Sequence, residues 1–361
     1  MKRNNRLMVF ICLILVTALS LVACTGPANN PTEPGKSVAE TSGESAVTAV
    51  ESAPEYNFVL VQAGIHPFYD PFPQAIDDAT ADLGIPKPQL QAVAFLSQEE
   101  QFTLIESLIA QGINGLAIQP ADPVAGNEII TQMMNQGINV VGFAGPPSEP
   151  TDMLFCLATD TETAAYEGAK HLIEAIGGSG NIVHITGQAQ DGNTQKRIEG
   201  VQRAVDENPG MTLIQTITDV DATEAAQNAI DSLLSASEDQ IDGIISTVYI
   251  PSVTLATVFT QRQESRIKVV ACDADDAVIQ AIKDGYITGT MNQNPYAQAY
   301  LCIKALKMFE DGWTYKEDSP FFLDSGFVYL NQDNVGQKDE LARKSMESLA
   351  SSFEDYFNPP A

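Results

Sequence analysis

Short apolar runs alternate with longer amphipathic segments along the chain from residue 56 onward. The runs are typical of strands buried on both faces, and they lie at residues 56–62, 115–119, 139–143, 181–185, 242–247 and 268–272. Two apolar stripes with helical spacing lie between them, formed by Phe102, Ile105, Leu108 and Ile109 and by Ile129, Ile130, Met133 and Met134. A glycine suited to a left-handed helix cap follows each stripe, at Gly112 and Gly137. Because strand and helix alternate strictly, the pattern predicts an α/β fold with doubly wound parallel sheets and helices on both faces.

The N-terminus has a different pattern. Lys2, Arg3 and Arg6 precede an uncharged, predominantly apolar stretch at residues 7–23, which is the layout of an export signal. The stretch ends in Leu21-Val22-Ala23-Cys24, which resembles the bacterial lipobox, and the resemblance implies cleavage before Cys24 and lipidation of its thiol. We therefore expect a lipoprotein signal peptide at residues 1–23. The alternative is an uncleaved membrane anchor, since a run of this length is at the lower limit for spanning a bilayer.

Residues 25–54 are rich in Pro, Ser, Thr, Ala, Asn and Glu and contain no aromatic residue. A segment of this composition buries too little surface to fold. We therefore expect residues 24–54 to form the lipidated cysteine and a disordered tether.

Charge and cysteine content narrow the classes of function. The formal net charge is -28, and loss of the three cations of the signal would leave -31 (-28 - 3). Phosphate binding needs clustered Lys and Arg, so nucleic acid is disfavoured as a partner, and the acidity fits solubility. Cys156, Cys272 and Cys302 remain beyond the signal and the lipidation site, in apolar surroundings. Three scattered cysteines form no disulfide framework and are expected to be buried thiols.

Motifs of catalysis and metal binding are missing from the sequence. The three histidines, His66, His171 and His184, have no second ligand at zinc spacing. There is no nucleophile elbow, no phosphate-binding loop after a strand and no dinucleotide fingerprint. The acidic stretches 219–221 and 273–276 lack the central glycine and the closing glutamate of a calcium loop. We therefore expect a protein without cofactor or metal that is not an enzyme.

Several phrases, in their order, resemble the type I periplasmic binding proteins of the ribose and galactose kind. They cover about residues 56–330 and lie at 66–69, 111–122, 135–141, 197–201, 269–273 and 282–295. The resemblance implies two doubly wound parallel-sheet lobes joined by three hinge crossovers, near residues 158–159, 293–294 and 323–325. The N-terminal lobe would comprise 55–158 plus 294–323, and the C-terminal lobe 159–293 plus 324–334. Residues 335–361 would add a C-terminal helix, with Leu341, Met346, Leu349, Phe353 and Tyr356 on its apolar side.

Polar and aromatic residues follow the predicted strands, where open parallel sheets bind ligands. A sugar needs flat aromatic faces and planar carboxylates or amides, and this set offers both. The candidate ligand-binding residues are His66, Phe68, Tyr69, Asp122, Phe143, Asp191, Asn193, Arg197, Tyr249, Asp273 and Gln293.

The resemblance implies particular roles for four of these residues. It implies that Phe68 and Tyr69 stack on the ligand, that Asp273 binds a hydroxyl and that Gln293 lies beside the hinge. The alternatives are ordinary core for the aromatic residues and a helix N-cap for Asp273. Either Arg197 or Gln195 matches the ligand-binding arginine of the family.

Departures from the family's pattern bear on the ligand. Phe143-Ala144-Gly145 stands where many sugar-binding relatives carry Asp-Arg, and Tyr249 follows a strand where they place Asn. These differences favour a less polar or differently shaped ligand.

We expect an extracytoplasmic solute-binding lipoprotein, monomeric and lipid-anchored to a bacterial membrane. It would capture a monosaccharide or sugar-like molecule and deliver it to an ABC permease. The alternatives are a ligand sensor for a chemoreceptor or histidine kinase, and a nucleoside-binding protein.

Overall fold

The computed structural model describes residues 56–94 and 96–360. The chain divides into two units, Met1–Ser52 and Ala53–Ala361, and the description concerns the second. The predicted signal peptide, Cys24 and the tether lie outside the described residues. Within the described ranges, no helix has the length and apolar character needed to cross a bilayer.

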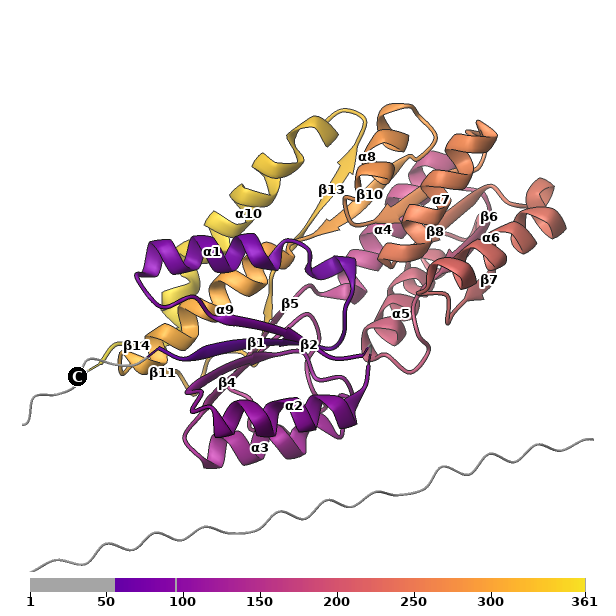
Figure 1. Cartoon of the computed structure of the whole chain (residues 1–361). Coiled ribbons are helices and arrows are strands. Elements are labelled where there is room, and N and C mark those ends of the chain that lie inside the picture. Colours follow the sequence, from indigo (N-terminus) through magenta and orange to yellow (C-terminus); the bar gives the residue numbers. More distant parts are fainter. Residues whose placement is uncertain (1–55, 95, 361) are drawn as a thin grey trace, which may run out of the picture. The chain divides into compact units, whose positions relative to one another are not determined.

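Two six-stranded sheets organise the chain (Figure 1). The first sheet is entirely parallel, in the order β12 (Phe322–Asp324), β5 (Cys156–Ala158), β4 (Asn139–Phe143), β3 (Gly115–Ile118), β1 (Phe58–Gln62) and β2 (Gln89–Ala92). The second has the order β13 (Phe327–Asn331), β10 (Gly289–Gln293), β9 (Lys268–Cys272), β8 (Gly243–Ser246), β6 (Gly180–Ile185) and β7 (Met211–Ile217). Its strands are parallel except β13, which runs antiparallel to β10 at the edge.

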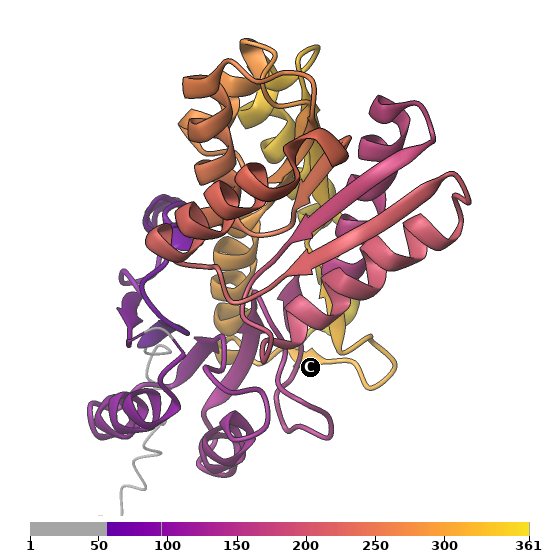
Figure 2. The ribbon, with the colours of Figure 1, turned by 90° about the vertical axis from the view of Figure 1, so that its right-hand side faces the viewer.

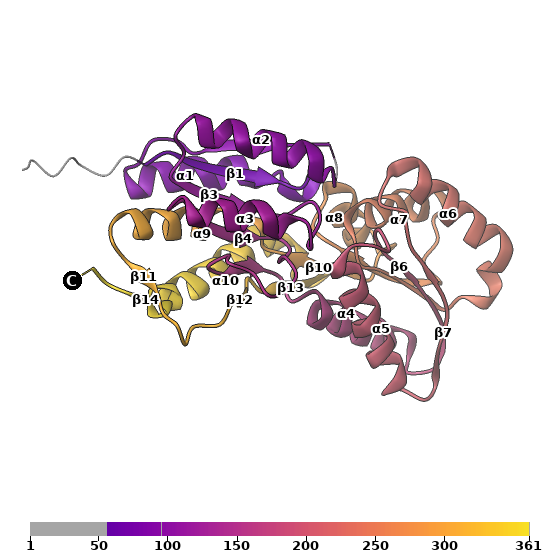
Figure 3. The same ribbon diagram turned by 90° about the horizontal axis from the view of Figure 1, so that it is seen from below.

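Helices cover both faces of each sheet, and we call each sheet with its helices a lobe. In the first lobe, α1 (Phe72–Leu83) and α9 (Pro295–Glu310) pack on one face, and α2 (Gln98–Ala110) and α3 (Gly126–Asn135) on the other. In the second lobe, α4 (Thr161–Ile176) and α5 (Gly192–Asp206) cover one face (Figures 2 and 3). The opposite face carries α6 (Thr223–Ser237), α7 (Tyr249–Arg262) and α8 (Asp276–Lys283). The predicted α/β fold with two doubly wound lobes is confirmed, apart from the antiparallel β13.

The predicted helix ends are also present in the structure. Gly112 and Gly137 adopt φ values of 76° and 79°, in the left-handed region that glycine enters without steric cost. Ile105 and Leu108 of α2, and Ile130 and Met133 of α3, are buried. The two apolar stripes therefore face the first sheet as predicted.

Three segments connect the sheets. They lie between β5 and α4, between β10 and α9, and between β12 and β13. Buried hydroxyl and amide groups hold them together: Thr159 Oγ1 and Ser325 Oγ lie 3.2 Å apart, and Gln298 Nε2, in the first turn of α9, donates to Ser325 Oγ at 2.9 Å. Hydrogen bonds thus link two of the segments to each other and to the start of α9.

The C-terminal segment differs in part from the predicted helix. The helix α10 (Lys338–Phe353) ends before a 3₁₀ turn (Glu354–Tyr356) and a short strand β14 (Phe357–Asn358), which pairs with β11 (Thr314–Tyr315). Phe357 is buried in the core of the first lobe and is paired with Tyr315 of β11. Figure 1 shows α10 running from α1 and α9 toward α8 and β13.

Candidate functional site

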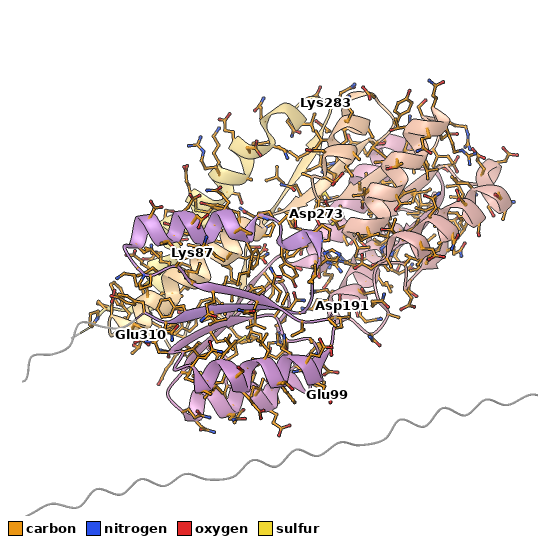
Figure 4. All side chains as sticks on the ribbon, in the orientation of Figure 1. Lys87, Glu99, Asp191, Asp273, Lys283 and Glu310 are labelled. Carbon is orange, nitrogen blue, oxygen red and sulfur yellow. The ribbon has the colours of Figure 1, made fainter. Side chains whose placement is uncertain are left out.

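A pocket of about 90 Å³ lies where the carboxyl ends of the two sheets face each other. In each sheet, counted in chain order, the second strand lies on one side of the first strand, and the third, fourth and fifth strands lie on the other side. Where the strand order reverses in this way, an open sheet leaves a crevice for ligands. The first lobe and the hinge side contribute His66, Phe68, Tyr69, Gln119, Ala144 and Gln293, and the second lobe contributes Asp191, Asn193, Arg197, Asp221, Val248, Tyr249 and Asp273. Figure 4 shows the labelled Asp191 and Asp273 between the ribbons of the two lobes.

A short 3₁₀ helix after β1 (Pro67–Tyr69) positions the aromatic residues of the first lobe. His66 caps it: its Nδ1 accepts a hydrogen bond from the Phe68 backbone N–H at 3.1 Å. The Tyr69 hydroxyl donates to Gln119 Oε1, and burial raises the pKa of this hydroxyl, so it stays a donor. The rings of Phe68 and Tyr69 meet edge to face, with 5.2 Å between centroids. Tyr69 also packs in the core of the first lobe, so one side chain both lines the pocket and belongs to the core.

Asp273 is the carboxylate most enclosed by the second lobe. It follows β9, is 8% exposed and adopts a φ of 65°, a left-handed conformation that is strained for most residues other than glycine. Gln293 Nε2 donates to both carboxylate oxygens, at 3.1 and 3.2 Å. Burial raises the pKa of the Asp273 carboxyl, while the Gln293 hydrogen bonds and the charge of Arg197 oppose that rise.

The N-cap of α8 is Asp275, not Asp273. Asp275 accepts hydrogen bonds from the Ala277 backbone N–H and from the Tyr249 hydroxyl, both at 2.7 Å. The alternative interpretation of Asp273 as the cap is therefore wrong. Asp273 is left facing the pocket, with Gln293 as its hydrogen-bonding partner.

The guanidinium of Arg197 also faces the pocket. Its side chain is 12% exposed, and Nη1 lies 3.7 Å from an oxygen of Asp191, which caps α5. Gln195 instead donates to the Ala189 carbonyl oxygen at the surface. Of the two alternatives from the sequence, the structure places Arg197 in the pocket.

Contacts between the lobes cross the pocket. Asn193 Nδ2 donates to the Ala144 carbonyl oxygen at 3.1 Å, and His66 Nε2 lies 3.6 Å from Asp221 Oδ1. The rings of His66 and Tyr249 meet edge to face at 5.9 Å. The pocket is therefore bordered by both lobes.

Nine of the eleven candidate residues line this pocket, and two do not. Phe143 is fully buried against Tyr69 and Phe72, because its side chain points from β4 toward α1 and not beyond the strand end. Asp122 accepts hydrogen bonds from the backbone N–H groups of Val124 and Ala125 and lines a neighbouring cavity. Both remain outside the pocket in this conformation.

Four lining residues were not predicted from the sequence: Gln119, Ala144, Val248 and Asp221. Gln119 is the last residue of a predicted strand, and Ala144 and Val248 directly follow predicted strands, so their position was a usable signal. Asp221 follows β7, whose mixed polar and apolar residues form no apolar run.

The pocket combines aromatic faces with hydrogen-bonding groups of both kinds. Three carboxylates, of Asp191, Asp221 and Asp273, face one guanidinium. This balance suits a neutral polyhydroxy ligand and disfavours an anionic one. In the described part of the chain, no three His, Cys, Asp or Glu side chains gather as a metal site would require. Cys156, Cys272 and Cys302 are buried free thiols, as predicted.

A buried histidine behind the pocket makes the second lobe sensitive to acid. His184 on β6 is fully buried, and its Nε2 lies 2.8 Å from Thr247 Oγ1. Burial, aided by the charge of Arg197, lowers the pKa of His184 from 6.5 to about 3. Below pH 6.5 the unfolded chain therefore binds a proton at His184 that the folded chain does not bind. The free energy of unfolding thus decreases as the pH is lowered.

We expect His184 to lower the free energy of unfolding by about 2 kcal/mol when the pH is lowered from 7 to 5. Urea unfolding at both pH values, for the protein and for His184→Asn, measures the effect. The pH-dependent loss should be smaller by that amount in the variant. An equal loss in both proteins would show that His184 titrates alike in the folded and unfolded states.

Comparisons with known proteins agree with this geometry. A family model described as a periplasmic binding protein domain matches residues 57–312. The chain is 20% identical over 235 residues to the xylitol-binding protein of Mycolicibacterium smegmatis, covering 65% of this chain and 66% of that protein. It is 22% identical over 251 residues to the xylose/arabinose-binding protein XylF of Sulfolobus acidocaldarius, covering 64% and 60%. The matches thus span less than two thirds of either relative.

A solved structure confirms the fold. The solute-binding protein of an ABC transporter from Burkholderia graminis, in complex with D-arabinose, superposes with a TM-score of 0.70 at 23% identity. The superposition covers 79% of this chain and 98% of that chain. The family match extends over most of the chain and includes five of the six strands in each sheet. This chain therefore belongs to the periplasmic binding protein family, a family of binding proteins and not of enzymes.

Proposed function

We propose that this protein is an extracytoplasmic solute-binding lipoprotein that captures a monosaccharide or sugar-like molecule and delivers it to an ABC importer. The observation that carries the proposal is the pocket between the lobes. Phe68 and Tyr69 from one side meet Asp273 and Arg197 from the other. Aromatic faces pack on the C–H surfaces of a sugar, and paired carboxylate and guanidinium groups bind its hydroxyls. The names of the relatives, which bind xylitol, xylose and arabinose, support a sugar of this size.

Capture would proceed by closure of the lobes about the three connecting segments. These segments follow Ala158, Gln293 and Asp324, the last residues of β5, β10 and β12. A ligand that contacts both lobes binds the closed form better and so shifts the population toward it. The closed form would then be the one that the permease recognises. Lobe boundaries at these positions are part of the proposal.

Membrane attachment through Cys24 completes the proposal. The apolar stretch that ends at Cys24 supports it. Two or three acyl chains, at about 0.8 kcal/mol per buried methylene, hold a protein firmly to a bilayer. The folded unit would act as a monomer at the end of the tether of residues 25–54.

Thermal unfolding against a ligand panel tests the proposal. The panel contains pentoses, pentitols, hexoses, nucleosides and, as negative controls, amino acids. A ligand at ~1,000 times its Kd adds about 4 kcal/mol, which raises the midpoint by several degrees. We expect such a shift with at least one pentose, pentitol or hexose. A shift with nucleosides alone would replace the sugar by a nucleoside, and a shift with amino acids alone would contradict the proposal.

A further inference from the structure

A second and larger cavity adjoins the ligand pocket. This groove has a volume of about 730 Å³, against about 90 Å³ for the pocket. Four residues line both spaces: Phe68, Tyr249, Asp273 and Gln293. Ligand sites typically measure about 300–1,000 Å³. The groove therefore has the size of a ligand site and borders the pocket directly.

The helix α10 forms one wall of the groove. Its half-buried Leu341 packs against the core of the second lobe, while Phe353 is buried in the core of the first. Asn294 Nδ2 donates to the Ala342 carbonyl oxygen at 3.1 Å, which holds the helix beside the hinge. This arrangement turns Ala342 and Met346 toward the groove. The wall lies outside the family match, which ends at residue 312.

The opposite walls offer aromatic faces with fixed hydroxyls. The Tyr249 hydroxyl donates to Asp275, and the Tyr296 hydroxyl donates to Asp78, each at 2.7 Å. Phe68 lies at the border between pocket and groove. Aromatic rings in such positions suit further sugar rings or an aromatic aglycone.

The charges along the groove select against anions. Asp70, Asp276, Asp339 and Glu347 line it together with the cations Lys338 and Arg343. The excess of carboxylates would repel a sugar acid or a sugar phosphate. A neutral chain of hydroxyl groups meets no such penalty.

We infer that the ligand is a neutral glycoside or short oligosaccharide, with one sugar ring in the pocket and the remainder in the groove beside α10. The inference rests on the proposed function and narrows its ligand class.

Calorimetric titration distinguishes a failure of this inference from a failure of the proposed function. The probes are D-xylose, D-arabinose and D-glucose, each beside a disaccharide and a phenyl glycoside built on it. We expect at least one extended probe to bind at least tenfold more tightly than its parent sugar. If parent sugars bind and no extended probe binds more tightly, the inference is overturned and the proposed function stands. If no sugar or glycoside binds, both are overturned.

Variants that fill the groove complete the test. Ala342→Trp on α10 should remove the gain of the extended probe and leave the affinity for the parent sugar unchanged. Gln74→Trp, on the exposed surface of α1 across the groove, should do the same from the other wall. Ser348→Trp, on the exposed side of α10, is the matched control and should keep the gain. An undiminished gain in both groove variants would overturn the inference.

Discussion

Replacement of Asp273 by alanine is expected to weaken sugar binding by at least tenfold. A buried carboxylate that accepts from a ligand hydroxyl makes a charged hydrogen bond worth about 1.5–3 kcal/mol, which corresponds to roughly ten- to a hundredfold in affinity. Gln293 already holds both oxygens in place, so the carboxylate is oriented before the ligand arrives. Calorimetric titration of Asp273→Ala with the sugar that the panel identifies gives the change in Kd.

Two further variants serve as controls for this experiment. Asp273 has a φ of 65°, which alanine tolerates less well than asparagine, so Asp273→Asn tests for a backbone effect. Asp273→Asn should also lose affinity, because it removes the charge. Asp284→Ala, at the exposed end of α8, should bind as the unaltered protein does. Unchanged affinity in Asp273→Ala would remove this residue from the binding site.

The largest expected loss of stability follows from truncation of Phe353. This side chain is fully buried at the end of α10, with ring centroids 6.0 Å from Phe155 and 5.3 Å from Phe357. Deletion of a buried phenyl ring typically costs about 3–5 kcal/mol, which is the sum of the lost burial and the cavity left behind. We expect Phe353→Ala to lower the free energy of unfolding in urea by about 3–5 kcal/mol.

Ser351→Ala, on the exposed side of the same helix, should change stability by less than about 0.5 kcal/mol. If Phe353→Ala were equally mild, α10 would be an appendage and not part of the core of the first lobe. The groove proposed beside it would then lose its fixed wall.

The strands that could be predicted from the sequence are those in which most consecutive residues are apolar and buried. β3 is apolar throughout, and β4 and β9 are apolar after their first residue, because helices cover these strands on both sides. The edge strands β2 and β7 were missed, since all of their residues except Met211 remain at least partly accessible and their composition is mixed. β5 and β12 are too short to form a recognisable run, and the direction of β13 depends on the Ser325-Gly326 turn between two sheets.

Residues of the candidate site could be predicted only where the end of a strand could be predicted. His66, Phe68 and Asp273 follow predicted strands and do reach the pocket. Phe143 is the last residue of β4, where the alternation of side chains still decides its direction, and it points into the core. The partner of His66 across the pocket, Asp221, follows a strand with no apolar signal. Contacts between lobes depend on how two sheets are placed, which no local pattern encodes.

The attachment of α10 to both lobes has a mechanical consequence. An α-helix is stiff along its axis, so any separation of the two sheets must shear the contact at one of its ends. The Phe353 end is fully enclosed by aromatic rings, while Leu341 at the other end is only half-buried. In the proposed opening, the half-buried contact at Leu341 would break first, and α10 would stay with the first lobe. The free energy of opening would then depend on Leu341, which does not line the ligand pocket.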